Sequence, residues 1–191
     1  FPSKMIKYIQ YIVRGVSVLK TGFIGVGNMG GAILRSFAAS DNIDTGSLYI
    51  YSRTVSKTEA LARELGVKTC GSAAELAKAC DIIIIGVKPD TVASVMEQIA
   101  PVYTPDKIII SMAAGISIRA IEDMAGVSAK VIRIMPNTPV MVGEGMTAIF
   151  VNDNITEEDK QTVYDMFSRT GRAEFADESM IHCIIGVSGS S

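Results

Sequence analysis

The architecture of this chain can be inferred outward from one short stretch, Gly22-Phe23-Ile24-Gly25-Val26-Gly27-Asn28-Met29-Gly30. An apolar run, Thr21–Val26, has the length of a buried strand, and a helix-period segment follows the stretch. Gly25, Gly27 and Gly30 therefore form a GxGxxG pattern at a strand-to-helix turn. In that position the first glycine permits a tight turn, the second lets a pyrophosphate approach the backbone, and the third allows close packing of helix on strand. The pattern predicts a dinucleotide site with its anion at a helix N-terminus.

Short apolar runs and helix-period segments alternate from about Leu19 onward, which is typical of βαβ units around a parallel sheet. The predicted strands are Thr21–Val26, Ser47–Tyr51, Ile82–Val87, Lys107–Ser111, Val131–Met135 and Thr147–Val151. The predicted helices are Gly30–Ala39, Ser56–Leu65, Ala73–Ala79, Thr91–Ile99 and Ser117–Met124. The unbroken run Ile82-Ile83-Ile84-Ile85 indicates a sheet covered on both faces. We therefore predict an α/β fold with a doubly wound, Rossmann-type sheet.

Helix boundaries have their own signals in this sequence. Ser56 and Ser72 are candidate N-caps, and Gly66 and Gly126 can end helices in a left-handed turn. Thr156, followed by Asp159, predicts the start of a helix over 154–170.

The C-terminal part of the chain continues with a brief strand, Arg172–Phe175, and a helix, Asp177–Ile185. We interpret residues 19–176 as a dinucleotide-binding domain and residues 177–191 as the start of an all-α domain that is mostly missing. Residues 1–18 carry apolar side chains at helical spacing with basic residues between them, and we interpret them as an N-terminal extension.

Composition excludes several classes of function. The 18 basic and 20 acidic residues nearly cancel and form no long block of one sign, so nucleic acid is not expected as a partner. No stretch approaches the roughly 20 apolar residues of a membrane-spanning helix, so no membrane partner is expected either. Cys70, Cys80 and Cys183 are odd in number and lack metal-ligand spacing, which indicates reduced thiols in a cytoplasmic protein without a metal site.

The end of the second predicted strand indicates which nicotinamide cofactor is bound. An NAD site usually carries a carboxylate there, about 20 residues past the glycines, to bind the ribose 2′-hydroxyl. Here the stretch Tyr51–Lys57 contains no carboxylate, but it contains Arg53 and Lys57 together with several hydroxyls. Such groups suit a 2′-phosphate, so NADPH is favoured and NAD remains the alternative.

Further segments resemble the pyrroline-5-carboxylate reductases. They are the glycine stretch itself, Val87-Lys88-Pro89, Ser111-Met112-Ala113-Ala114-Gly115-Ile116, Arg133-Ile134-Met135-Pro136-Asn137-Thr138-Pro139 and Val187-Ser188-Gly189-Ser190-Ser191. The resemblance runs from about Phe23 to Ser191. In an open α/β sheet, ligands gather at the carboxyl ends of strands. We expect three stretches of these segments to lie there: Val87-Lys88-Pro89, Ala113-Ala114-Gly115 and Asn137-Thr138-Pro139.

The resemblance, together with the glycine and strand-end patterns, implies a set of site residues. The cofactor-binding residues are Ile24, Gly25, Gly27, Asn28, Met29, Gly30, Ser52, Arg53, Thr54, Lys57, Val87, Lys88, Pro89, Met112, Ala113, Ala114 and Asn137. Ser188, Gly189 and Ser190 would hold the substrate carboxylate. No catalytic residue is assigned within the chain, and the resemblance places a catalytic hydroxyl beyond Ser191. Lys88 could instead be an ordinary surface charge, and Asn137 and Thr138 could simply hold a turn.

The function that the resemblance implies is reduction of a small-molecule imine, 1-pyrroline-5-carboxylate, to L-proline by NAD(P)H. The full-length protein is expected to be a homodimer or higher homo-oligomer, and the chain alone is expected to be poorly active. Two alternatives stay open at this point: a β-hydroxyacid dehydrogenase-like oxidoreductase and a non-catalytic NADP-binding module.

Overall fold

A computed structural model describes residues 18–41, 43–126 and 128–186 of the chain. Residues 1–17 of the predicted extension and the predicted substrate loop, Ser188–Ser190, lie outside these ranges. The described residues form one sheet, whose strands are β1 (Thr21–Ile24), β2 (Leu48–Tyr51), β3 (Lys68–Thr69), β4 (Ile82–Ile85), β5 (Ile108–Ser111), β6 (Lys130–Pro136), β7 (Gly145–Val151) and β8 (Gly171–Phe175). The helices are α2 (Asn28–Ala39), α3 (Val55–Leu65), α4 (Ala73–Ala79), α5 (Pro89–Ile99), α6 (Ile118–Ala125), α7 (Glu157–Phe167) and α8 (Ile181–Ile184).

The sheet has the order β3-β2-β1-β4-β5-β6-β7-β8, and the first six strands of this order are parallel. The chain leaves β1 toward β2 and β3 on one side and later returns to β4, β5 and β6 on the other. This reversal beside β1 is the switch point at which open α/β sheets bind ligands. The predicted doubly wound class is confirmed.

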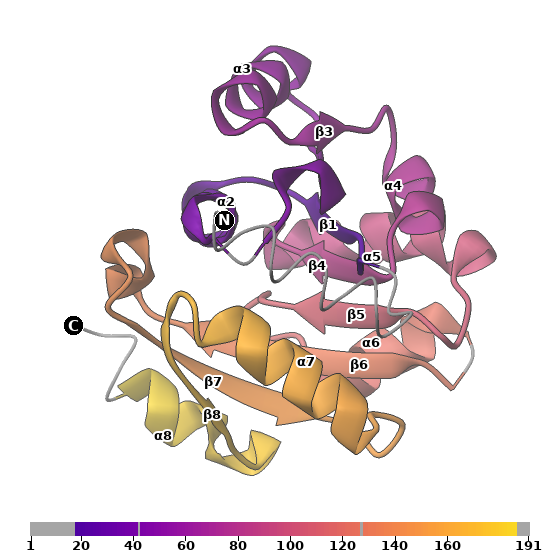
Figure 1. The fold of residues 1–191 in the computed structure, drawn as a ribbon. Helices are drawn as coiled ribbons and strands as arrows, with labels where there is room; N and C mark the ends of the chain where they lie inside the picture. Colours follow the sequence, from indigo (N-terminus) through magenta and orange to yellow (C-terminus); the bar gives the residue numbers. More distant parts are fainter. Residues whose placement is uncertain (1–17, 42, 127, 187–191) are drawn as a thin grey trace.

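Both faces of the sheet are covered, as the isoleucine run predicts. Ile83 and Ile85 belong to the hydrophobic core beneath α4, α5, α6 and α8, whereas Ile82 and Ile84 belong to the core beneath α2, α3 and α7. Because successive side chains of a strand point to opposite faces of the sheet, β4 contributes to both cores. Figure 1 shows α7 on the near side of the sheet and α6 on the far side.

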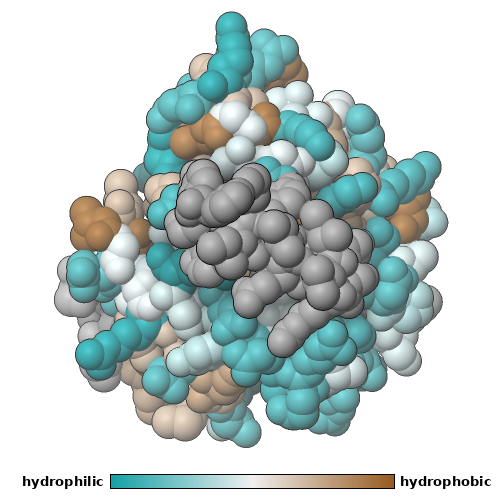
Figure 2. Space-filling model, viewed as in Figure 1, coloured by the Kyte–Doolittle hydropathy of each residue, from teal (hydrophilic) through white to brown (hydrophobic). Residues whose placement is uncertain are grey.

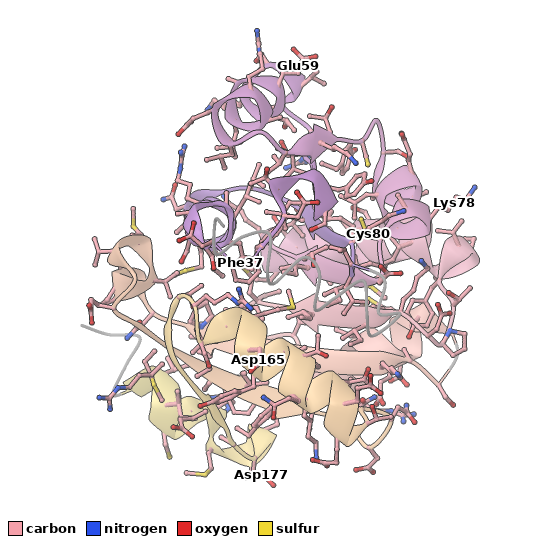
Figure 3. The ribbon with its side chains drawn as sticks, viewed as in Figure 1. Phe37, Glu59, Lys78, Cys80, Asp165 and Asp177 are labelled. Carbon is pink, nitrogen blue, oxygen red and sulfur yellow. The ribbon has the colours of Figure 1, made fainter. Side chains whose placement is uncertain are left out.

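Three aromatic rings hold α2 in place over the sheet. The Phe37 ring of α2 lies 5.8 Å from the ring of Phe23 in β1 and 5.6 Å from the ring of Phe167 in α7, both edge to face. All three side chains are fully buried, and Phe37 is labelled in Figure 3. The helix that follows the glycine turn is therefore fixed against both the sheet and α7.

The sheet departs from the predicted pattern at its far edge. The connection between β6 and β7 contains only a short 3-10 turn, η3 (Thr138–Val142), and β7 runs antiparallel to β6. A parallel return would need a crossover of about a dozen residues or more, so the short connection allows only the antiparallel one. The two-residue strand β3 was also not predicted, because it is shorter than any pattern can identify.

The predicted helix boundaries are partly confirmed. Ser72 and Thr156 cap their helices with side-chain hydrogen bonds, and Gly66 and Gly126 end theirs with positive φ. Ser56 is wrong as a cap, because α3 begins one residue earlier, at Val55, with Thr54 as its N-cap residue.

The predicted single helix over Asp177–Ile185 is also wrong. The Asp177 side chain accepts a hydrogen bond from the Ser179 amide and starts a 3-10 turn, η4 (Glu178–Met180), before α8 begins. None of the helices within the described ranges is long and apolar enough to cross a bilayer.

Candidate functional site

The glycine turn lies at the carboxyl end of β1. Gly25 has φ +92°, and a Cβ built there would lie 2.7 Å from Cγ1 of Val87. A Cβ on Gly30 would lie 2.6 Å from the carbonyl oxygen of Gly25. A Cβ on Gly27 would meet no atom within 4 Å. Gly25 and Gly30 are therefore required by the fold itself, while Gly27 leaves an open approach to the backbone.

The first turn of α2 faces this approach. Gly27 is its N-cap residue and has no side chain to satisfy the first amides, and the first turn contains no acidic side chain. Helix N-terminal amides that lack an internal acceptor form an anion site together with the helix dipole. Asn28 is exposed and Met29 half-buried beside these amides. This local chemistry fits the pyrophosphate of a dinucleotide.

The end of β2 carries the groups predicted for a 2′-phosphate. The Ser52 and Thr58 hydroxyl oxygens lie 2.6 Å apart, and the Thr58 hydroxyl also donates to the Thr54 carbonyl at 3.0 Å. These bonds fix the shape of the loop. Arg53 and Lys57 are both exposed, and neither has an ion pair or side-chain hydrogen bond among the described residues. Both cations are thus available to an anionic ligand.

The ends of β4 and β5 adjoin the glycine turn through backbone hydrogen bonds. The Gly86 amide donates to the Ile24 carbonyl at 2.8 Å, and the Met112 amide donates to the Ile85 carbonyl at 3.2 Å. Contact is so close that a Cβ on Gly86 would lie 2.6 Å from the Gly25 oxygen. The structure therefore brings together two predicted loops. One contains Val87, Lys88 and Pro89, and the other contains Met112, Ala113 and Ala114. Of these, Lys88, Pro89 and Ala114 are exposed and Ala113 is buried.

Asn137 directly follows β6 and holds a backbone turn, which is one of the two roles that the sequence left open for it. Its side-chain oxygen accepts from the Met146 amide at 2.8 Å, and its own amide donates to the Met146 carbonyl at 3.2 Å. The carboxamide oxygen is therefore used in closing the β6–β7 connection. The carboxamide NH₂ makes no hydrogen bond within the described part of the chain, so it remains as a donor at the carboxyl ends of the parallel strands.

The segment before the predicted substrate loop packs by only a few side chains. Ile181 is buried in the core, Ile184 and Ile185 are half-buried against it, and Met180 is exposed. His182 and Cys183 are exposed. Figure 3 labels Asp177 at the start of this segment.

Apolar side chains are also exposed on η3, which follows the carboxyl end of β6. Met141 and Val142 are 65% and 76% exposed. On the face shown in Figure 2, most of the surface is hydrophilic, and one of its few brown patches lies over this turn.

The three thiols differ in their surroundings. Cys80 is fully buried, and burial raises the pKa of its thiol to about 12, so it is unreactive at neutral pH. Cys70 is half-buried, and Cys183 is exposed. Among the residues that the structure describes, no group of three His, Cys, Asp or Glu side chains could hold a metal ion.

Sequence reasoning missed two polar residues near this site, Arg133 and Glu178. Arg133 is buried in β6, and its Nη1 lies 2.8 Å from Oε1 of Glu178 in η4. The available signal was an arginine within the otherwise apolar run Val131–Met135, because a buried charge requires a partner.

The fold, the glycine turn and the loops around it define an oxidoreductase domain of the dinucleotide-binding class. A family model described as "NADP oxidoreductase coenzyme F420-dependent" matches residues 20–115, about half of the chain. The chain belongs to this family, and, as the sequence resemblance predicts, proteins similar to it include the pyrroline-5-carboxylate reductases.

Individual relatives show the extent of the similarity. The pyrroline-5-carboxylate reductase of Escherichia coli is 40% identical over 172 residues, which cover 90% of this chain and 64% of that protein. The crystal structure of the Plasmodium falciparum pyrroline carboxylate reductase with NADP bound has a TM-score of 0.81 at 34% identity, covering 90% of this chain and 62% of that one. The Coxiella burnetii enzyme gives a TM-score of 0.86 at 27% identity over 92% of this chain and 65% of that one. The chain thus spans less than two thirds of the length of these relatives.

Proposed function

We propose that this chain provides the NADP(H)-binding part of a reductase that converts 1-pyrroline-5-carboxylate to L-proline. The observation that carries the proposal is the open approach at Gly27, at the sheet's switch point and beside the free N-terminus of α2. The similarity to pyrroline-5-carboxylate reductases supports the choice of substrate.

The choice of NADPH over NADH rests on Arg53 and Lys57. Two exposed cations without partners among the described residues stand where an NAD site would carry a carboxylate. A guanidinium can bind a phosphate through two parallel hydrogen bonds, which a ribose hydroxyl cannot match. The P. falciparum relative was solved with NADP bound, which agrees with this assignment.

The chemistry requires little of the protein beyond position. When bound, NADPH supplies a hydride to the carbon of the C=N bond, and the imine nitrogen, already protonated, becomes the amine of proline. In this proposal the backbone around Val87–Pro89 and Met112–Ala114 lines the nicotinamide half of the site. The small side chains of Ala113 and Ala114 leave space there, and the Asn137 NH₂ is a donor at the reacting end.

The remaining parts of the proposal concern organisation. Residues 19–176 form the cofactor-binding unit, and residues 177–191 lead into a substrate loop in which Ser188, Gly189 and Ser190 hold the substrate carboxylate. The protein acts in the cytoplasm and assembles as a homo-oligomer, which its mass in solution would test.

The decisive experiment has two stages. Fluorescence titration of this chain with NADPH and NADH tests the cofactor assignment. Consumption of NADPH with 1-pyrroline-5-carboxylate, and detection of proline as the product, then tests the reaction in the gene product that contains these residues. NADPH binding without proline formation in that gene product would favour a non-catalytic NADP-binding module instead.

A further inference from the structure

One carboxylate oxygen joins three segments beside the proposed site. Oε1 of Glu178 accepts a hydrogen bond from the buried Arg133 guanidinium at 2.8 Å and another from the Ile118 amide at 3.0 Å. The Arg133 side chain is only 8% exposed, and that of Glu178 is 29% exposed. The ion pair is therefore largely removed from water, and each charge depends on the other.

Each of the three segments belongs to a different part of the proposed site. Ile118 is the first residue of α6, directly after the loop that begins with Met112. Arg133 lies on β6, four residues before Asn137. Glu178 begins η4, whose chain continues through α8 toward Ser188. A single side chain thus connects the proposed cofactor loop to the segment that leads into the proposed substrate loop.

The segment from Glu178 onward needs such an anchor. Helix α8 contains only four residues, and a helix of that length has no stability of its own in water. The attachments of residues 178–186 to the rest of the fold include the buried Ile181, the half-buried Ile184 and Ile185, and the Glu178 carboxylate. Apolar contacts are not directional, so the hydrogen-bonded carboxylate is the group that sets the position of this segment.

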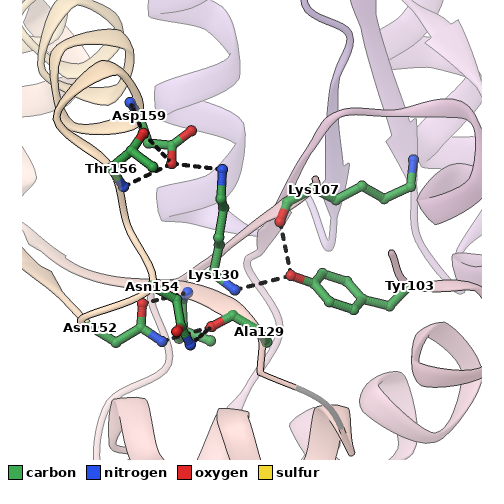
Figure 4. Close-up of polar contacts among 9 residues, drawn as sticks. Tyr103, Lys107, Ala129, Lys130, Asn152, Asn154, Thr156 and Asp159 are labelled. Atoms are coloured by element: carbon green, nitrogen blue, oxygen red, sulfur yellow. Dashed lines mark hydrogen bonds and ion pairs between the residues drawn. The ribbon is translucent and has the colours of Figure 1, made fainter. Parts of the chain in front are cut away.

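A second ion pair on the same strand provides a comparison. Nζ of Lys130 lies 2.8 Å from Oδ2 of Asp159, and the two side chains are 21% and 15% exposed (Figure 4). This pair joins the start of β6 to α7 and touches neither η4 nor the loop after β5. It is similar in chemistry and burial to the Arg133–Glu178 pair but lies at the start of the strand, three residues before Arg133.

We infer that Glu178 is a positioning residue, which holds the start of the substrate segment in register with the cofactor loop. This inference rests on the proposed function, and it assigns Glu178 to substrate affinity rather than to cofactor affinity. The group acts through the backbone of η4 and α6 and does not itself touch the reacting atoms.

The test compares Glu178→Ala, Glu178→Gln and the double variant Arg133→Met/Glu178→Met, with Lys130→Met as the matched control. The double variant removes both charges together, so it stays informative if Glu178→Ala fails to fold. Three quantities are measured in the gene product that contains this chain: the KM for 1-pyrroline-5-carboxylate, the Kd for NADPH, and hydrogen exchange over residues 112–118 and 178–186.

We expect Glu178→Ala and the double variant to raise the imine KM about tenfold and to leave the NADPH Kd within about twofold. Exchange should accelerate at the Ile118 amide, whose acceptor is lost, and throughout residues 178–186. Glu178→Gln keeps an acceptor oxygen and should recover most of the KM. Lys130→Met should change neither constant.

An unchanged KM in a folded variant, or an equal loss of NADPH affinity, would overturn the inference. Absence of imine reduction by the wild type would refute the proposed function instead. In that case hydrogen exchange alone decides whether Glu178 anchors the segment, and unchanged exchange would reject the anchor as well.

Discussion

The two ends of the parallel strands use several of their polar groups in opposite ways. At the amino end, the Tyr103 hydroxyl donates to the Lys107 carbonyl at 2.9 Å and accepts from the Lys130 amide at 3.0 Å (Figure 4). The Lys107 ammonium donates to the Cys80 carbonyl at 2.7 Å, and the Asn152 NH₂ donates to the Ala129 carbonyl at 2.7 Å. These polar groups are thus bonded within the protein.

The carboxyl end keeps its donors available. Arg53, Lys57 and Lys88 are exposed and have no ion pair among the described residues, and the backbone at Gly27 is open. Both ends occur on the same strands, so the difference does not come from the sheet itself. A group bonded internally contributes to stability, whereas a group without an internal partner is free to bind a ligand. Substitutions at the two ends should therefore have separable effects.

The largest effect is expected at Gly27. Gly27→Val should weaken NADPH binding by more than about 100-fold, because its side chain would occupy the space of the pyrophosphate. The fold should survive, since a Cβ there meets no protein atom within 4 Å. Fluorescence titration and thermal unfolding measure the two quantities.

Gly30→Val is the matched control, three residues along the same turn. Its Cβ would lie 2.6 Å from the Gly25 oxygen, so this variant should lower the melting temperature. A folded Gly27→Val variant that still binds NADPH normally would contradict the proposed site.

A smaller effect is expected at Arg53. Arg53→Ala should weaken NADPH binding by about 1.5–3 kcal/mol, the value of a charged hydrogen bond, and leave NADH binding nearly unchanged. Arg63→Ala, which removes an exposed arginine from the other end of α3, is the control and should affect neither cofactor. Equal losses for NADPH and NADH would reject the 2′-phosphate assignment.

The amino end should show the converse behaviour. Tyr103→Phe removes the acceptor of the Lys130 amide and should lower the free energy of unfolding by about 1–2 kcal/mol. The NADPH Kd should stay the same, because the proposed cofactor site lies at the opposite end of the strands. Denaturant unfolding and titration of the same sample check both statements, and a weakened Kd would show that the two ends are coupled.

The smallest effect concerns the pH dependence of stability at the amino end. Burial raises the pKa of Asp159, but hydrogen bonds from Lys130 and Thr156 outweigh it and bring the pKa below its ordinary value of 3.8. The ionised form is thus favoured by folding. Its contribution is present above the unfolded pKa and is lost as pH falls through the lower, folded pKa.

Lys130→Met removes one of these hydrogen bonds, so the variant should lose less stability than the wild type between about pH 5 and pH 2. Denaturant midpoints at a series of pH values measure the difference. Identical pH profiles for the two proteins would show that the Lys130–Asp159 bond does not lower this pKa in solution.

Sequence alone determined the parts of this protein that depend on neighbouring residues. The three glycines specify the turn after β1, because only glycine fits φ +92° at Gly25 and the contact at Gly30. The isoleucine run predicts a strand buried on both faces, and Thr156 with Asp159 forms the predicted capping box. The cations at the end of β2 were likewise identifiable by their distance from the glycines. Each of these signals lies within a few residues or at a fixed spacing in one βα unit.

Only the tertiary structure decided which distant groups meet. Asn137 uses its side-chain oxygen on the Met146 amide, β7 returns antiparallel to β6, and Arg133 pairs with Glu178 across 45 positions of the chain. An arginine in an apolar strand predicts that a partner exists, but not which carboxylate supplies it. Several acidic residues follow Arg133 in the sequence, and the choice among them depends on how η4 packs against β6 and α6. That packing is a property of the whole fold, because the buried charge can be balanced only where the surrounding core leaves a position for its partner.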